Sequence, residues 1–242
     1  SLDDGIPYYP TLTAIAESPF DPMVLYAGTD DGNVKVTQDG GKTWLEVSAR
    51  IDGLPDDAWI NGIEASRFDE GVVFLAANNY RNDDFENYLY MSVDIGQTWV
   101  DITGDLPARR VVRTIRQDTR NSQLLYVGTE LGLFVSLNAG RQWIDLRNNM
   151  PLMAINDLVI HPRDNDLILG THSRGIWILD NLNALQELNS ESLVADFELF
   201  SVPDAEQIRY TRAFAHAGDM LFRGENPPAG ALVDYYLKEN VS

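Results

Sequence analysis

Cysteine is absent from this sequence of 242 residues. Its absence excludes disulfide bonds and thiolate chemistry, and it leaves the redox compartment open. No apolar run approaches the roughly 20 residues that a membrane-spanning helix requires. The first five residues, SLDDG, lack the basic and apolar segments of a signal peptide. The sequence therefore predicts a globular protein without membrane insertion.

Basic residues are also scarce. Lys and Arg number 18 against 37 Asp and Glu, and the formal net charge is -19 at pH 7. Lysine occurs only at Lys35, Lys42 and Lys238. Nucleic acids and anionic membranes bind clustered basic residues, so neither is an expected partner. Such an acidic surface is typical of a well-solvated extracellular protein or of one from a salty habitat.

An eight-residue pattern occurs three times. Thr37–Trp44 (TQDGGKTW) and Ser92–Trp99 (SVDIGQTW) are nearly identical in type, and Ser136–Trp143 (SLNAGRQW) is a decayed copy. In each copy a short acid or amide can bond the backbone two residues on, and the following Gly accommodates positive φ. The expected structural residues are Thr37, Asp39, Gly41, Thr43, Trp44, Ser92, Asp94, Gly96, Thr98, Trp99, Ser136, Asn138, Gly140 and Trp143.

Short apolar runs flank each copy, so each pattern predicts a hairpin turn within a repeated array of sheets. Four short antiparallel strands per unit are typical of one propeller blade. We therefore expect an all-β protein, a β-propeller of about four blades of four strands. Its ring is either partial or completed by self-association. The expected blades are approximately 11–48, 59–103, 111–147 and 154–200.

The remaining segments carry further expectations. In the fourth unit a short helix over 180–188, with Asp180 as N-cap, replaces the turn motif, and Val194–Phe200 is expected to supply the fourth strand. Residues 1–10 are expected to end a preceding segment. Residues 201–230 are expected to form a linker, and 231–242 the first strand of a truncated following domain.

The repeated octapeptide is identified as the Asp box, or bacterial neuraminidase repeat. The chain thus resembles the Asp-box β-propellers, which include sialidases, two-propeller xyloglucanases and the sortilin luminal domain. Three segments, Tyr80–Phe85, Gly128–Ser136 and Gly170–Asp180, are similar to the last blades of large secreted bacterial glycosyl-hydrolase-like proteins. Ser173 stands where that family has glycine. The resemblance implies a secreted or periplasmic protein, with Asp boxes on the outer part of each blade, away from any catalytic centre.

Candidate ligand-binding residues come from aligning the first strands of the four units. The alignment places polar side chains at one equivalent position, on the channel side of the propeller: Thr13, Asn61, Arg113 and Asn156. Amide and guanidinium groups there could bond sugar hydroxyls or a carboxylate. The alternative is that they bond one another and water in a polar channel.

Three more residues are weaker candidates: Asp157, His172 and Arg174. The last two follow the second strand of the fourth unit, so they could either contact a ligand or brace neighbouring blades. No arrangement of His, Asp and Glu has metal-ligand spacing, and the octapeptide lacks the additional oxygen ligands of a calcium loop. We expect no metal and no cofactor.

Evidence for catalysis is sparse. Glycoside hydrolysis needs two carboxylates held roughly 5–9 Å apart, and the candidates are Glu64, Asp83, Asp84, Glu130 and Asp157. None can be singled out. The one basic cluster is Arg109, Arg110, Arg113 and Arg116. It differs from a sialidase arginine triad, which comes from separate blades, and strict alternation sends Arg113 and Arg116 to opposite faces.

Three hypotheses follow. The first is a non-catalytic or catalytically incomplete propeller segment that acts as a carbohydrate- or protein-binding scaffold in a secreted bacterial protein. The second is a fragment of a glycoside hydrolase, xyloglucanase-like or sialidase-like, although we expect no activity from this chain alone. The third is an assembly module, in which exposed blade edges join another copy or missing blades to complete a ring.

Overall fold

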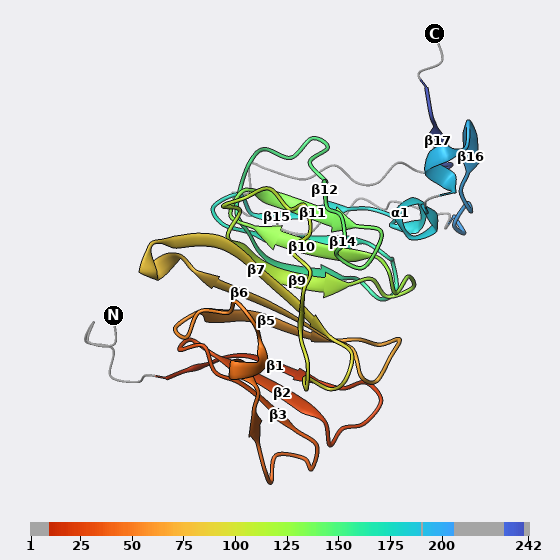
Figure 1. Cartoon of the computed structure of the whole chain (residues 1–242). Coiled ribbons are helices and arrows are strands. Elements are labelled where there is room, and N and C mark those ends of the chain that lie inside the picture. Colours follow the sequence, from red (N-terminus) through yellow and green to blue (C-terminus); the bar gives the residue numbers. More distant parts are fainter. Residues whose placement is uncertain (1–9, 190, 206–229, 240–242) are drawn as a thin grey trace, which may run out of the picture.

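The structure is a computed structural model that describes residues 10–189, 191–205 and 230–239. Antiparallel β-sheets form the framework of this part of the chain (Figure 1). Three sheets have four strands each, and their bounds are as follows: β1 (Leu12–Glu17), β2 (Leu25–Thr29), β3 (Val34–Thr37) and β4 (Leu45–Glu46); β5 (Trp59–Ala65), β6 (Val73–Asn79), β7 (Asp84–Ser92) and β8 (Val100–Asp101); β9 (Val112–Gln117), β10 (Leu125–Thr129), β11 (Gly132–Ser136) and β12 (Ile144–Asp145).

The other elements follow in chain order. The fourth sheet has three strands, β13 (Ile155–Ile160), β14 (Leu167–Thr171) and β15 (Ile176–Leu179). A separate two-stranded sheet pairs β16 (Phe197–Leu199) with β17 (Tyr235–Leu237). The short helices are η1 (Ser48–Arg50), η2 (Tyr80–Asn82), α1 (Asn183–Glu187) and η3 (Ser192–Val194).

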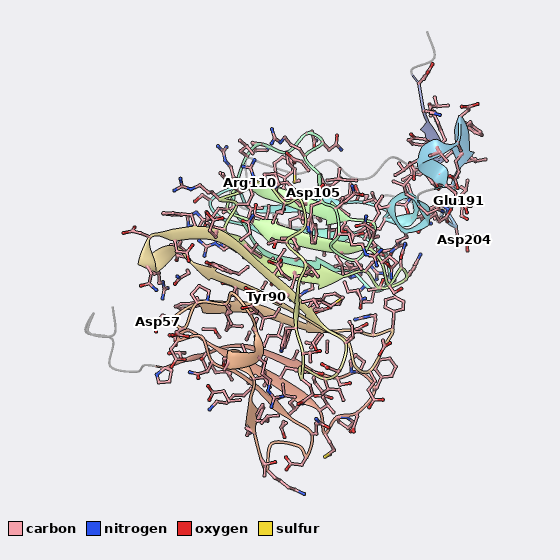
Figure 2. All side chains as sticks on the ribbon, viewed as in Figure 1. Asp57, Tyr90, Asp105, Arg110, Glu191 and Asp204 are labelled. Carbon is pink, nitrogen blue, oxygen red and sulfur yellow. The ribbon has the colours of Figure 1, made fainter. Side chains whose placement is uncertain are left out.

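The four large sheets follow one another around a common line of first strands. β1 lies against β5, β5 against β9, and β9 against β13. Figure 1 shows the sheets in this succession, and side chains fill the spaces between them (Figure 2). Within the described residues β13 has no comparable contact with β1, so the succession is open. This arrangement confirms the predicted all-β fold of antiparallel propeller blades.

The fourth strand of the last blade was predicted wrongly. Phe197–Leu199, within the expected segment Val194–Phe200, pairs with Tyr235–Leu237 rather than with β15. The cause is α1, which follows β15: Gln186 Nε2 donates to Asp118 Oδ2 (3.0 Å), and this bond holds the helix against the third sheet. The chain therefore leaves the edge of β15. Most of the predicted linker and residues 1–9 lie outside the described residues.

The short helix itself is confirmed, but its start is not. α1 has Leu182 as N-cap, and no side chain caps it. Asp180, which we expected as N-cap, precedes it and is exposed. Its carboxyl group is nevertheless partly desolvated, which raises the pKa of Asp180, and the negative charge of Asp166 adds to the shift. Leu182 is fully buried instead, so packing rather than a capping bond fixes where this helix begins.

The three octapeptide turns connect the third and fourth strands of their sheets, at the outer edge of each blade. In the first turn Thr43 N–H and Thr43 Oγ1 donate to the two oxygens of Asp39 (2.9 and 2.6 Å). Gly41 N–H donates to Thr37 Oγ1 (3.0 Å). Hydrogen bonds from Thr43 and Thr37 lower the pKa of Asp39 from 3.8 to about 2. The second turn repeats these bonds with Ser92, Asp94, Gly96 and Thr98.

The third turn has the same loop, but an Asn–Gln pair replaces the Asp–Thr pair of the first two turns. Gln142 N–H donates to Asn138 Oδ1 (2.9 Å), in place of the bond from Thr43 N–H to the carboxylate. Asn138 Nδ2 then donates to Gln142 Oε1 (3.2 Å), so the side-chain bond runs in the opposite direction. Trp143, which follows, is buried, and its Nε1 donates to Ile102 O (3.0 Å).

Each first strand contains a bulge at the same place. The pairing with the second strand skips one residue in every blade, and the skipped residues are Thr13, Asn61, Arg113 and Asn156. A bulge breaks the strict alternation of side chains along a strand. The alternation that predicted opposite faces for Arg113 and Arg116 therefore does not hold across this point.

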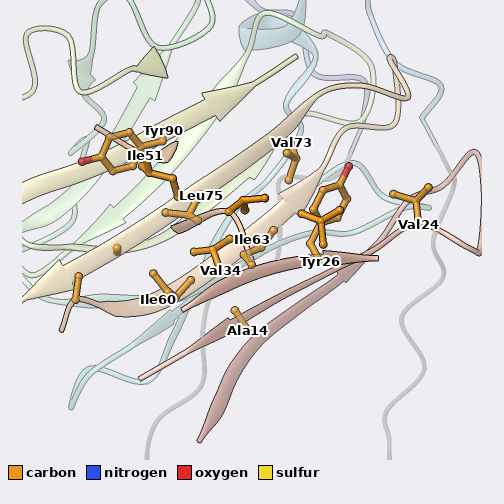
Figure 3. Packing of buried hydrophobic residues seen from close by; sticks show 14 residues of the cluster. Ala14, Val24, Tyr26, Val34, Ile51, Ile60, Ile63, Val73, Leu75 and Tyr90 are labelled. Carbon is orange, nitrogen blue, oxygen red and sulfur yellow. The ribbon is translucent and has the colours of Figure 1, made fainter. Parts of the chain in front are cut away.

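The sheets meet across closely packed faces. Between the first two, Tyr26 and Val34 pack against Ile60, Ile63 and Leu75 (Figure 3). We call the face of a sheet that meets the preceding sheet its leading face, and the other its trailing face. Small residues on the trailing face allow the approach: a Cβ on Gly128 would lie 2.7 Å from Ile155 O.

We predict that Gly128→Ala destabilises the protein by about 1–3 kcal/mol, because the added methyl overpacks this junction. Gly170→Ala is the matched control. Gly170 holds the same register position in the fourth sheet, where the nearest atom to an added Cβ is 3.5 Å away. Urea unfolding followed by circular dichroism measures both. Equal unfolding midpoints for the two variants would contradict the role of close approach.

Candidate functional site

A pocket of about 210 Å³ lies beside the bulged first strands. Its lining comes from five elements of three blades: Trp59 and Asn61 of β5, Asn78 of β6, Tyr80 and Arg81 of η2, Arg113 of β9, and Asn156 of β13. We call it the inner pocket. It brings together three of the sequence candidates from distant parts of the chain, because the repeated bulge puts them at equivalent places in adjacent blades.

The base of the inner pocket holds an incompletely bonded amide. Asn78 is only 1% exposed, and its Nδ2 donates to Asn61 Oδ1. Its own Oδ1 is buried and has no hydrogen-bond partner among the described residues. Arg113 Nε is likewise buried without a partner. A buried polar atom left unpaired costs free energy that a bound ligand can recover.

Two arginines and two aromatic rings form the walls. The Arg81 guanidinium stacks 3.7 Å from the centroid of the Trp59 ring, and that of Arg113 lies 4.8 Å from the Tyr80 ring. Burial raises the pKa of Tyr80, but hydrogen bonds and positive charge from Arg81 and Arg113 outweigh it. The pKa of Tyr80 is therefore below its usual value of 10.0. The lining of the inner pocket thus contains two guanidinium groups and no carboxylate, in a strongly acidic protein.

Arg113 is held by Glu130, with which it forms an ion pair. Glu130 was a candidate carboxylate for catalysis, and here it orients the guanidinium. Asp84, another candidate carboxylate, also has a structural role, because it accepts hydrogen bonds from Asn79 Nδ2 (2.9 Å) and Tyr88 OH (2.6 Å). Asp83 ends η2 with φ 58, which is the left-handed conformation.

A second pocket, of about 260 Å³, lies between the same first strands beyond Arg116. We call it the arginine pocket; Glu64, Arg67, Arg116 and Gln117 are among its lining residues. Arg116 bonds Glu64 Oε2 (3.2 Å) and Asp157 Oδ1 (3.4 Å). Its Nε donates to Leu158 O (2.8 Å), which joins β9 to β13.

Glu64 is the titratable group most affected by this surrounding. Burial raises the pKa of Glu64 above 4.5, and the positive charges of Arg116 and Arg67 only partly oppose the shift. Asp157, by contrast, has a side chain that is 63% exposed. The arginine pocket therefore combines a mostly buried carboxyl group with two guanidinium groups, and one of these, Arg116, also bonds the exposed Asp157.

His172 and Arg174 lie apart from both pockets, in the turn between β14 and β15. Both are exposed. His172 N–H donates to Ala154 O (3.0 Å), and Arg174 O accepts from Trp177 Nε1 (3.2 Å). Ser173 has φ 68, a conformation that glycine adopts with less strain. The glycine usual at this position in the resembled family fits that backbone.

Four pocket residues were not among the sequence candidates: Trp59, Asn78, Tyr80 and Arg81. Three of them lie in the segment that lengthens the second blade, Asn78–Asn87, whose polar composition was the available signal. Among the described residues no group of His, Asp and Glu is placed to hold a metal ion. No helix there is long and apolar enough to cross a membrane.

The fold and the bulged first strands define a β-propeller whose ring is open in the described residues. No protein-family model matches the sequence, and the comparison with curated proteins finds no match either. Many solved structures are similar in fold. The GH74 xyloglucanase from Xanthomonas campestris has a TM-score of 0.60 at 16% identity, covering 71% of this chain and 29% of that one.

Two other similar structures have different contexts. The extracellular domain of a one-component system from B. thetaiotaomicron has a TM-score of 0.54 at 19% identity, with 70% of this chain and 21% of that one covered. YCF48 bound to a D1 peptide has a TM-score of 0.51 at 16% identity, with 68% and 48% covered. This chain spans less than half the length of each, and the likeness is one of fold.

We predict that Arg81→Gln or Arg113→Gln raises the pKa of Tyr80, because each substitution removes a positive charge and a hydrogen bond from the phenolate. The measurement is an ultraviolet absorbance titration of each variant minus the same variant carrying Tyr80→Phe. Arg109→Gln, whose guanidinium lies 5.3 Å from the Phe85 ring outside the pocket, serves as control. A Tyr80 titration that is identical in all variants would contradict the electrostatics described.

Proposed function

We propose that the chain is a segment of an Asp-box β-propeller that binds a carbohydrate or peptide ligand in the inner pocket without catalysing its conversion. The observation that carries the proposal is the unpaired Asn78 Oδ1 at the base of that pocket, beside the unpaired Arg113 Nε. A ligand hydroxyl or amide can donate to the amide oxygen and accept from the guanidinium. Sugars and peptides both present such groups.

The walls of the inner pocket support the same ligand classes. The Trp59 ring is stacked by Arg81, and together they give a flat amphipathic surface of the kind that packs against a sugar ring or a peptide plane. Of the similar structures, one is a xyloglucanase and one is bound to a peptide. Another is the extracellular domain from B. thetaiotaomicron, which favours a secreted or periplasmic location for this chain as well.

The three turns support the Asp-box part of the proposal. In the first two, a Ser or Thr hydroxyl, an Asp carboxylate and a Thr hydroxyl bond one another as the repeat requires. All three turns lie at the outer edge of their blades. We accordingly assign them a structural role and place ligand binding at the inner strands. We also propose the first three expected blade boundaries, 11–48, 59–103 and 111–147, as those of blades in a larger, sortilin-like or xyloglucanase-like scaffold.

The test is binding to a glycan array that includes xyloglucan oligosaccharides, and to a peptide library. We expect the wild-type chain to bind, and we expect Arg81→Ala to raise the dissociation constant at least tenfold. A tenfold rise corresponds to a loss of about 1.4 kcal/mol of binding free energy. Arg109→Ala is the control, because Arg109 also lies over an aromatic ring but not in the pocket. The absence of any bound glycan or peptide, or equal losses in both variants, would refute the proposal.

A second candidate function is glycoside hydrolysis, and Glu64 favours it. A mostly buried carboxyl group with a raised pKa suits a general acid, and Asp157 on the other side of Arg116 is a second carboxylate. We expect that any release of reducing sugar from xyloglucan is abolished by Glu64→Gln and reduced by Asp157→Asn. Asp83→Asn serves as the matched change outside both pockets. Retention of activity in Glu64→Gln would exclude this mechanism.

A further inference from the structure

The first and last sheets of the succession each present an uncovered apolar face. On the leading face of the first sheet, Leu12 and Ile15 of β1 are 56% and 64% exposed. On the trailing face of the fourth sheet, Ile176 and Ile178 of β15 are 72% and 55% exposed. Exposed aliphatic residues gathered on one face of a sheet mark an interaction surface.

Strand register shows which positions these residues occupy. Ile15 pairs with Ala27 of β2, as Ile63 pairs with Leu75 and Ile115 with Val127 in the next two sheets. Ile63 and Ile115 are no more than 5% exposed, because each lies on a leading face that a preceding sheet covers. The leading face of the first sheet is thus built like the others and lacks only its neighbour among the described residues.

The trailing face of the fourth sheet follows the same rule. Ile176 pairs with Gly170 of β14, as Val34 pairs with Gly28 and Leu133 with Gly128. Val34 and Leu133 are at most 1% exposed, since a following sheet covers them. The two uncovered faces are therefore the two halves of one kind of junction, which the chain already forms three times internally.

The leading face of the first sheet also contains a hollow. Lys35, one of only three lysines, pairs with Ala27 on the leading face of the first sheet, where Leu12, Ile15 and Trp44 enclose a hollow of about 350 Å³. Lys35 already forms an ion pair with Glu46 (3.9 Å), so the apolar side chains decide what this hollow can receive, and the exposed Ile176 and Ile178 of the trailing face have the matching chemistry.

We infer that, when this chain is a separate molecule, a second copy of it covers both faces. The leading face of each copy docks on the trailing face of the other, so two equivalent junctions close a dimer about a twofold axis. Each of the eight large sheets, four from each copy, then has a neighbour on both sides. Each junction joins two different faces, and closure after two copies distinguishes the dimer from an open filament. This assembly is independent of ligand binding in the inner pocket.

Sedimentation equilibrium across the micromolar range tests the inference with three variants. Ile15→Arg blocks the leading face, Ile178→Arg blocks the trailing face, and Val93→Arg alters an exposed aliphatic residue in the second octapeptide turn. We expect a dimer for the wild-type chain and for Val93→Arg, and a monomer for each face variant alone. Because all three positions are exposed, unchanged thermal unfolding checks that the variants fold.

Mixing the two face variants makes the test specific. Ile15→Arg keeps its trailing face and Ile178→Arg keeps its leading face, so an equimolar mixture is expected to form a weaker dimer through the one intact junction. Added salt is expected to strengthen all dimers, because it screens the repulsion between copies of net charge -19. A monomeric wild-type chain, a face variant that dimerises alone, a mixture without dimers, or an open series of oligomers would each overturn the inference.

Discussion

The close approach of one sheet to the next governs this structure. Two sheets can pack only if the trailing face of one has small residues where the leading face of the next has branched ones. Gly28 shows how tight the fit is, since a Cβ there would lie 2.4 Å from Ile60 Cγ2. Ala76 occupies the corresponding position in the second sheet, and Gly128 and Gly170 occupy it in the third and fourth. The position recurs because the junction recurs.

The repeated bulge converts this packing pattern into a site. An extra residue in each first strand frees one side chain per blade from the interface, and in three consecutive blades that side chain is Asn61, Arg113 or Asn156. These polar residues reach one pocket although up to 95 residues separate them along the chain (156 − 61). In the first blade the bulged residue is Thr13, whose hydroxyl instead donates to Ile60 O (2.8 Å) and joins two first strands.

Much of the fold could be predicted from sequence, because the octapeptide and the alternating apolar runs are local signals. Equivalence of the four bulged residues could be predicted for the same reason. The packing of η2 could not be predicted from the sequence. Arg81 lies over the Trp59 ring, and Tyr80 lies under the guanidinium of Arg113, so residues of other strands place both side chains. A strand after α1 was predicted, but its partner was not, because the pairing with Tyr235–Leu237 spans about a sixth of the chain and leaves no local pattern.

The arginines illustrate a second limit of sequence patterns. Strict alternation separates Arg113 from Arg116, whereas the bulge brings both to the region between neighbouring first strands, one in each pocket. A bulge has no dependable local signature in this sequence, and it becomes visible only when the four first strands are aligned with their partners. The electrostatics of Glu64 depend on Arg116 in the same way, through a contact between strands 52 residues apart.

The reversed bond in the third octapeptide turn has an evolutionary consequence. Replacing the acid by Asn138 and the hydroxyl by Gln142 removes one anionic group from the rim and keeps a two-point clasp across the loop. Such a paired exchange lets the repeat drift away from its consensus while the hairpin is preserved. Divergent propellers of this kind can therefore keep the hairpin structure after their sequences no longer match the consensus motif.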